Sequence, residues 1–208
     1  MSNFLKCGSP PKDLGYFDLR TKEMMIYLYL PIHMYGVTEI PERLDFIRPL
    51  ITAISQEHVA CGIIKKYIYV TVKSMIVTEG YAGNRMGWHV DGFSSNGDLN
   101  YIWYNMNPTE FAVQEFIEVS RDDKQSMIDM TNQAKAENII TYDCKHLLRL
   151  DEEVVHRVSP KSEHGWRTFI KITASDHKFI NEGNSKNYLF AYSWQMKSRI
   201  DGRNIDHE

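Results

Sequence analysis

Strand-like segments fill most of the chain between residues 67 and 174, and they constrain its fold more than any other feature. In 67–73, Ile and Val alternate with Tyr, Thr and Lys, which is the period-two pattern of a half-buried strand. An apolar run at 23–30 predicts one further, buried strand. The remaining strands are predicted at 99–106, 111–119, 138–142, 146–150, 153–158 and 166–174. So many strands favour two packed sheets, as in a jelly roll.

Two segments carry helical signals instead. In 42–59, Leu and Ile recur at helical spacing after Pro41, which suits a first helical turn, and Gly62 is a typical stop. Residues 122–136 follow a helix-start signal at Ser120, and their charged and amide side chains predict a helix lying across a sheet. The fold class expected is therefore mainly β with supporting helices, a double-stranded β-helix of the jelly-roll, cupin-like kind.

The composition indicates one folded domain over the whole chain, 1–208. Apolar residues make up 43% and aromatic residues 12%, which excludes a disordered protein, and no Pro/Gly-rich linker divides the chain. We expect an N-terminal strand and helical support in 1–66, a jelly-roll core in 67–175 and a C-terminal extension in 176–208. A last apolar segment lies within that extension, at 188–195.

Charge and cysteine usage narrow the partners and the compartment. The formal net charge is −3 with both signs interspersed, so the chain as a whole does not attract nucleic acid, although a local basic groove is compatible with it. The three Cys are widely spaced, which argues against a disulfide framework, and they lack the Cys-x-x-Cys spacing of a structural zinc site. The N-terminus lacks an apolar signal region, and no run approaches membrane-span length. We therefore expect a cytoplasmic protein with no membrane partner.

His89 and Asp91 stand two residues apart, so their side chains point to the same face of an extended backbone. A distant His156 can complete a 2-His-1-carboxylate set, which caps one face of an octahedral Fe(II) and leaves three positions open. With eight His and 27 acidic residues, about one His-x-acid pair is expected by chance, and a lone His is more often structural. The order of the three residues and the strands between them favour the metal site.

Arg167 follows His156 by eleven residues, on the next predicted strand. Its guanidinium offers a fixed, bidentate docking point for a carboxylate. The phase of the strand leaves the direction of this side chain open: if Ile170 and Ile172 face the core, Arg167 faces away from it. Either both faces of the strand are covered, or a bulge turns the Arg inward.

Three short motifs contain these four residues. They are Trp-His-Val-Asp-Gly at 88–92, Val-Val-His-Arg-Val at 154–158 and Trp-Arg-Thr-Phe-Ile at 166–170. Together they resemble the Fe(II)- and 2-oxoglutarate-dependent dioxygenase superfamily, in a motif order similar to that of prolyl hydroxylases, over roughly residues 67–175. The resemblance implies Fe(II) on His89, Asp91 and His156, and 2-oxoglutarate that chelates the iron and pairs its far carboxylate with Arg167. That family uses O2 to convert 2-oxoglutarate to succinate while a substrate is hydroxylated or oxidatively demethylated.

The same resemblance implies a second partner for the far carboxylate, often a Tyr hydroxyl on a neighbouring strand. The stretch 100–107 resembles the strand that supplies it, which makes Tyr104 the candidate and Tyr81, eight residues before His89, its competitor. The chain departs from the family pattern at Phe169, where some members place a Ser that shares the carboxylate.

Other functions fit the same residues. One alternative is a cupin-like metal enzyme that does not use 2-oxoglutarate, and another is a non-catalytic jelly-roll binding module. Nothing in the chain selects among a free small molecule, a protein side chain and a nucleobase as substrate, and a small molecule is the nominal choice because of the charge. The sequence also leaves the oligomeric state open.

Four aromatic residues close in sequence to the site could stack a planar substrate such as a base, or could simply pack in the core. They are Trp88, Tyr101, Trp103 and Trp166. Ordinary packing in the core and at its rim is the interpretation we favour. The loop 92–98 and the predicted helix 122–136 are expected to frame the entrance, since specificity usually resides in loops on a rigid scaffold.

Overall fold

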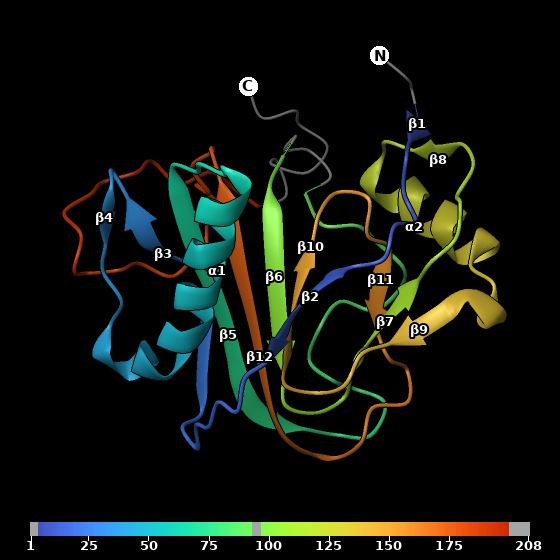
Figure 1. Cartoon of the computed structure of the whole chain (residues 1–208), viewed down its shortest axis with the longest axis horizontal. Coiled ribbons are helices and arrows are strands. Elements are labelled where there is room, and N and C mark those ends of the chain that lie inside the picture. Colours follow the sequence, from blue (N-terminus) through green and yellow to red (C-terminus); the bar gives the residue numbers. More distant parts are fainter. Residues whose placement is uncertain (1–3, 93–96, 200–208) are drawn as a thin grey trace.

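A computed structural model describes residues 4–92 and 97–199, and it is built mainly from antiparallel strands (Figure 1). The largest sheet has seven strands in the order β2-β10-β6-β12-β5-β3-β4. Their bounds are Lys12–Tyr16, His146–Leu150, Leu99–Tyr104, Gly165–Ser175, Tyr67–Val77, Met25–Met34 and Val37–Thr38, in the same order. A mainly β fold, as the strand patterns predicted, is therefore confirmed.

A second sheet of three strands faces the first. Its order is β11 (His156–Val158), β7 (Thr109–Ala112) and β9 (Ile139–Thr141). A short backbone bridge between His89 and His156 places residue 89 beside β11, on the free side of that strand. Between the two sheets lies a buried cluster that includes Tyr104 and Phe169 from the large sheet and Phe111 from the small one. A separate two-stranded sheet pairs β1 (Phe4–Leu5) with β8 (Val119–Ser120).

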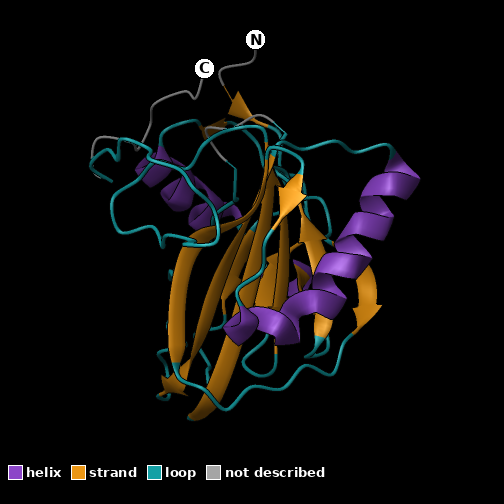
Figure 2. Cartoon of the chain, turned by 90° about the vertical axis from the view of Figure 1, so that its left-hand side faces the viewer, coloured by secondary structure: helices purple, strands orange, loops and turns teal. Residues whose placement is uncertain are grey.

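One helix covers the outer face of the large sheet (Figure 2). Helix α1 (Arg48–Cys61) follows a 3-10 helix, η1 (Glu42–Ile47), so the predicted helix 42–59 is helical throughout but changes type at Arg48. The reason is Pro49: it has no N–H for the carbonyl of Asp45, and its ring would crowd that carbonyl in an α-helix. The predicted stop is confirmed, because Gly62 ends α1 with a positive φ of 65°.

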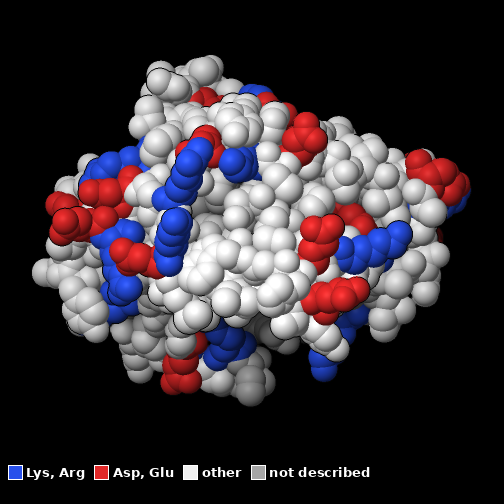
Figure 3. Space-filling view, turned by 90° about the horizontal axis from the view of Figure 1, so that it is seen from below, with Lys and Arg blue, Asp and Glu red and all other residues white. Residues whose placement is uncertain are grey.

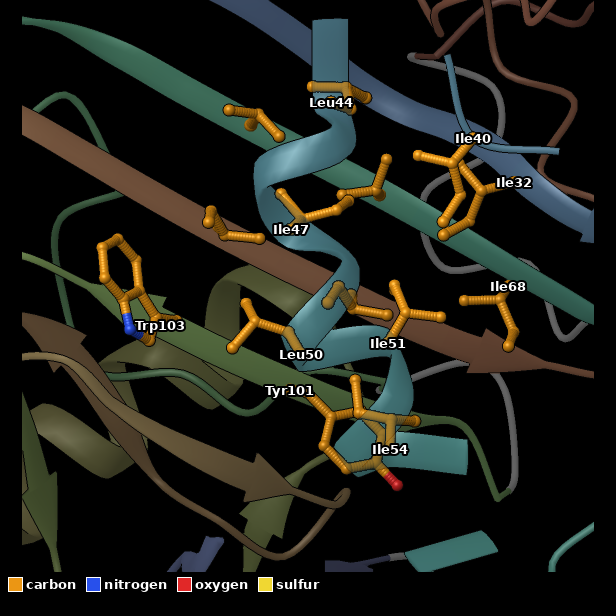
Figure 4. Close-up of a cluster of buried hydrophobic side chains, with 14 of the residues drawn as sticks. Ile32, Ile40, Leu44, Ile47, Leu50, Ile51, Ile54, Ile68, Tyr101 and Trp103 are labelled. Carbon is orange, nitrogen blue, oxygen red and sulfur yellow. The ribbon is translucent and has the colours of Figure 1, made fainter. Parts of the chain in front are cut away.

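The strands beneath α1 are apolar on their outer face because that face packs against the buried side of the helix. Leu50, Ile51 and Ile54 pack against the Ile and Val side chains of β5 and β12 and against Tyr101 and Trp103 of β6 (Figure 4). Both faces of the large sheet are thus covered, one by α1 and the other by the small sheet.

We expect Leu50→Ala to lower the free energy of unfolding by about 2–5 kcal/mol, because Leu50 is fully buried and its truncation leaves a cavity beneath α1. Urea denaturation measures this change. The matched control is Val59→Ala on the same helix, where the side chain is 85% exposed and the expected change is near zero. Equal effects of the two substitutions would contradict the assigned orientation of α1.

The second predicted helix, 122–136, is shorter in the structure. Helix α2 spans Asp123–Gln133, and the Asp122 carboxylate accepts hydrogen bonds from the backbone N–H groups of Lys124 and Gln125. This capping satisfies two of the amides that a helix start leaves without partners. A 3-10 turn, η2 (Ala136–Asn138), follows and leads into β9.

Several predicted strands differ from the observed ones in extent. The strand expected at 111–119 is two strands, β7 and β8, and the one expected at 153–158 begins only at His156. The strand expected at 23–30 continues past Pro31 to Met34 with two register shifts, since a proline is tolerated near a sheet edge and at bulges. The apolar segment 188–195 is neither helix nor strand.

Charged side chains of both signs alternate around a largely uncharged centre on the face seen in Figure 3. This view agrees with the interspersed charges of the sequence. Within the part of the chain that the structure describes, no helix is long and apolar enough to cross a membrane.

Candidate metal centre

The three predicted ligands meet between the two sheets. One ligating atom from each of His89, Asp91 and His156 lies within 4.8 Å of the other two. The Nε2 atom of His156 is 3.6 Å from the Asp91 Oδ2, and the two imidazole rings are 4.4 Å apart between centroids. His156, which is 65 positions after Asp91 in sequence, thus joins His89 and Asp91 in the compact cluster that a single metal ion requires.

Backbone pairing brings the two histidines together. The His89 N–H donates to the His156 carbonyl over 3.0 Å, and the His156 N–H donates to the His89 carbonyl over 2.9 Å. Gly87, with a φ of 89°, makes the turn that leads into this pairing, and an added Cβ there would lie 2.8 Å from the side chain of Met127. The Gly-rich loop before His89 therefore directs the pair into the gap between the sheets.

Each imidazole is oriented by a hydrogen bond from its Nδ1 to a backbone carbonyl. The His89 Nδ1 lies 2.9 Å from the Gly87 carbonyl, and the His156 Nδ1 lies 3.0 Å from the Val154 carbonyl. Because a carbonyl oxygen only accepts, both Nδ1 atoms must carry the proton in these contacts. The Nε2 atoms keep a free lone pair, which is the arrangement usual for histidines that bind metals.

The protonation states also suit a cation. Burial, together with the neighbouring His156, lowers the pKa of His89 to about 4, and burial lowers the pKa of His156 as well. Burial alone would raise the pKa of Asp91, but the ammonium of Lys171 and the two imidazoles hold that pKa below its ordinary value. At neutral pH the cluster therefore presents two neutral imidazoles and one carboxylate, the forms in which these groups bind a metal.

Lys171 also belongs to this site, although the sequence motifs did not identify it as a site residue. Its Nζ lies 2.7 Å from the Asp91 Oδ2 and reaches it from strand β12. Burial alone would lower the pKa of Lys171, but the Asp91 carboxylate raises it above its ordinary value. One signal was available: Lys171 stands four residues after Arg167, on the same face of a predicted strand.

We expect Lys171→Met to destabilise the metal-free protein by about 3–5 kcal/mol, because Asp91 loses its partner in a largely buried place. Bound Co(II) would replace the missing positive charge, so the rise in Tm on adding Co(II) should be larger in the variant than in the wild type. Thermal melting in EDTA and in Co(II) measures both quantities.

The control for that experiment is Lys73→Met, which removes a lysine whose Nζ donates to the Gly83 carbonyl and to the Asn84 side chain. Its rise in Tm with Co(II) should match that of the wild type. A rise in Lys171→Met no larger than in the wild type would contradict a cation site at Asp91.

Arg167 points into the same gap between the sheets. The register of β12 and β5 runs without a shift from Gly165–Val77 to Ser175–Tyr67, so no bulge turns the side chain. Instead both faces of β12 are covered: Ile170 and Ile172 lie under α1, and Arg167 lies on the opposite face with Phe169. The covered-strand alternative is therefore confirmed, and the bulge is excluded.

The Arg167 guanidinium is buried and only partly satisfied. Its Nε donates to the Met106 carbonyl over 3.2 Å and its Nη1 to the Ala82 carbonyl over 3.0 Å. Its Nη2 has no hydrogen-bond partner among the described residues. Burial lowers the pKa of Arg167 to about 10, so the group stays charged at neutral pH. A buried cation with a free donor favours an anionic ligand at this position.

The two tyrosine candidates lie in different surroundings. Tyr104 is fully buried, pairs with Phe169 across β6 and β12, and is close enough to influence the pKa of Arg167. Tyr81 is 75% exposed on the loop after β5. Tyr104 therefore shares the buried face with Arg167, where its hydroxyl donates to the Tyr142 carbonyl over 3.4 Å, whereas the side chain of Tyr81 faces solvent.

The four aromatic residues considered for stacking serve the fold instead. Trp88, Tyr101 and Trp103 are buried in hydrophobic clusters, and the Trp166 indole N–H donates to the hydroxyl of Ser74. Packing in the core is thus confirmed for Trp88, Tyr101 and Trp103, whereas Trp166 is half-buried at the rim. Of the predicted entrance loop 92–98, residues 93–96 lie outside the described part of the chain.

A comparison of the chain with family models, with curated proteins and with solved structures found no match.

Proposed function

We propose that the protein is an Fe(II)- and 2-oxoglutarate-dependent dioxygenase that hydroxylates or oxidatively demethylates its substrate. The observation that carries the proposal is the pairing of two features in one gap between the sheets. One is the His89–Asp91–His156 cluster, and the other is the buried, unsatisfied guanidinium of Arg167. The first suits Fe(II) with open positions, and the second suits the far carboxylate of the cosubstrate.

We propose further that residues 67–175 form a double-stranded β-helix. The strand order supports this proposal: β10-β6-β12-β5 are neighbours in the large sheet, and residue 89, β11, β7 and β9 are neighbours in the small one. From β5 to β12 the chain passes back and forth between the two sheets, except that β7 and β9 follow one another in the small sheet, and such alternation is typical of a jelly roll.

The residues present fit this cofactor set. When bound, iron and 2-oxoglutarate supply the oxidising chemistry: O2 converts the cosubstrate to succinate and CO2, and one oxygen atom goes to the substrate. The imidazoles of His89 and His156 and the carboxylate of Asp91 hold the metal, with both Nδ1 protons fixed on backbone carbonyls. Arg167 fixes the far carboxylate, and buried Tyr104 and Phe169 exclude water around it.

One observation favours the second candidate, a metal enzyme that does not use 2-oxoglutarate. Two nitrogens of Arg167 already donate to backbone carbonyls, so the guanidinium keeps fewer donors for a carboxylate than a free one has. In that case Arg167 would serve to tie β12 to the loops that precede β6 and β7, and the metal cluster alone would carry the chemistry.

The test uses the wild-type protein under anaerobic conditions. Addition of Fe(II) and then 2-oxoglutarate should produce a visible charge-transfer absorption, and admission of air should release succinate. Fe(II) binding without this absorption, and without succinate, would support the second candidate. Failure to bind Fe(II) or Co(II) at all would leave the Lys171–Asp91 ion pair as a structural contact and would overturn the proposal.

A further inference from the structure

The chain after β12 forms a second feature next to the metal centre. Residues 176–199 cross the edge of the large sheet beside β3 (Figure 1, orange to red). Between this segment and β3 lies a pocket of about 340 Å³. Its walls combine polar residues with four aromatic ones, Tyr29 of β3 and Phe179, Tyr192 and Trp194 of the extension.

The extension is tied firmly to the sheet, so the pocket exists before any ligand binds. Asn187 is buried, and its Nδ2 donates to the carbonyls of Pro31 and Glu39, each over 2.9 Å. The hydroxyl of Tyr69 donates to the His177 carbonyl and accepts from the Phe179 N–H. A preformed pocket loses little entropy when it binds a ligand.

The pocket offers ring faces and a cation. The rings of Tyr192 and Trp194 lie 4.6 Å apart at 48°, so they are tilted rather than stacked on each other. Lys186 also lines the pocket, with its Nζ 5.8 Å from the centre of the Tyr192 ring. Within the described part of the chain, Lys186 has no carboxylate at ion-pair distance, so its charge is available to an anion. Aromatic side chains next to a basic one are the usual receptors for planar rings that carry negative charge.

Tyr29 connects this pocket to the metal centre. Its ring lines the pocket, and the Nζ of Lys171 lies 5.8 Å from the centre of that ring. The same Nζ is 2.7 Å from the Asp91 carboxylate. The ring of Tyr29 and the side chain of Lys171 therefore form the path between a molecule in the pocket and the Asp91 carboxylate.

The inner face of the large sheet carries more positive than negative charge. Arg167 and Lys171 point into the gap from β12, and Lys73 is on the same face of β5, opposite Phe169. Asp91 is the acidic partner of Lys171, whereas Lys73 and Arg167 are bonded to neutral groups. With Arg167 assigned to the far carboxylate of the cosubstrate and Lys171 to Asp91, Lys73 keeps a positive charge that is bonded only to neutral groups, and this charge favours an anionic substrate.

We propose that the pocket between β3 and residues 176–199 binds the substrate, and that this substrate carries a planar aromatic ring next to an anionic group, as a nucleotide does. The inference rests on the proposed function for its chemistry, but its binding test is independent of that function. The ring lies against Tyr29, Tyr192 and Trp194, and the anionic group lies against Lys186. The carbon to be oxidised belongs to the part of the substrate that passes Tyr29 toward Asp91.

Calorimetric titration of the wild-type protein with the four deoxynucleoside 5′-monophosphates tests the inference. At least one should bind, and Trp194→Leu and Lys186→Ala should each weaken that binding by about fivefold or more. Lys186→Ala should have little effect on the uncharged nucleoside, because only the anionic contact is lost. The controls Tyr16→Leu and Lys22→Ala, which remove an exposed aromatic ring and an exposed lysine elsewhere, should leave binding unchanged.

A single-stranded oligonucleotide in the same titration distinguishes a base within a nucleic-acid strand from a free nucleotide as the natural ligand. Tighter binding of the oligonucleotide would indicate a base within a strand, and tighter binding of the monophosphate would indicate a free nucleotide. If no nucleotide or oligonucleotide binds, or if Trp194→Leu and Lys186→Ala bind as the wild type does, the inference is wrong even where Fe(II) and 2-oxoglutarate bind. Nucleotide binding without the charge-transfer absorption would instead overturn the proposed function, while the pocket would still be assigned as a nucleotide-binding site.

Discussion

His156→Ala is expected to abolish turnover and to weaken metal binding by more than about a hundredfold. Even residues that only orient a metal ligand cost about 10- to 100-fold in affinity when replaced, and His156 is proposed as a ligand itself. Its imidazole stands with its Nε2 turned to Asp91 and its Nδ1 bonded to the Val154 carbonyl. Titration with Co(II), followed by its visible d–d absorption, measures the affinity directly.

The matched control is His164→Ala. His164 lies on an exposed loop three residues before Arg167, so its loss should leave Co(II) affinity and turnover unchanged. A urea unfolding curve in EDTA checks that His156→Ala still folds. Undiminished Co(II) affinity in folded His156→Ala would contradict the metal site, and with it the dioxygenase.

Arg167→Lys should raise the Kd for 2-oxoglutarate by about ten- to a hundredfold while leaving Co(II) affinity unchanged. The substitution keeps the positive charge but replaces three nitrogens in one plane by a single nitrogen, which cannot bond to the separate Met106 and Ala82 carbonyls and also pair in a bidentate way with a carboxylate. Hydrogen bonds to charged groups contribute about 1.5–3 kcal/mol each, which corresponds to that range. Anaerobic titration of the charge-transfer absorption in the Fe(II) protein gives the Kd.

Arg157→Lys serves as the control for the arginine substitution. Arg157 pairs with Glu110 on the outer side of β11, with 2.7 Å between the Nη2 and the carboxylate, and lies over the Trp88 ring. Its replacement should not change the Kd for 2-oxoglutarate. If Arg167→Lys binds 2-oxoglutarate as tightly as the wild type, Arg167 is a structural tie between strands, and the enzyme without 2-oxoglutarate becomes the better proposal.

The local features of this chain were predictable because they depend on residues close together in sequence. The alternation in 67–73 marks a strand wherever that strand pairs, and the helical spacing after Pro41 identifies the buried side of α1. The spacing of His89 and Asp91 likewise puts both side chains on one face. Boundaries were less accurate: Pro49 alone divides the predicted helix into η1 and α1.

The remaining features depend on which strands become neighbours. Lys171 was not singled out because its partner, Asp91, lies 80 residues earlier, on another segment. Tyr104 was the candidate and Tyr81 its competitor on the sequence alone, and the burial that separates them follows from the pairing of β6 with β12, which encloses Tyr104 and leaves Tyr81 in solvent. The aromatic pocket arises from an extension in which the pattern predicted only one apolar segment.

By itself, then, the sequence determined the strand-rich class, the place of the long helix and the identity of the candidate metal ligands. The class and the helix follow from periodicity over a few residues, and the ligands follow from the spacing of His89 and Asp91 together with the order of the motifs that adds His156. Only the tertiary structure decided that Arg167 points inward, that Lys171 pairs with Asp91 and that residues 176–199 enclose a pocket. These are contacts between distant segments, and their geometry follows from strand pairing and from the covering of both faces of the large sheet.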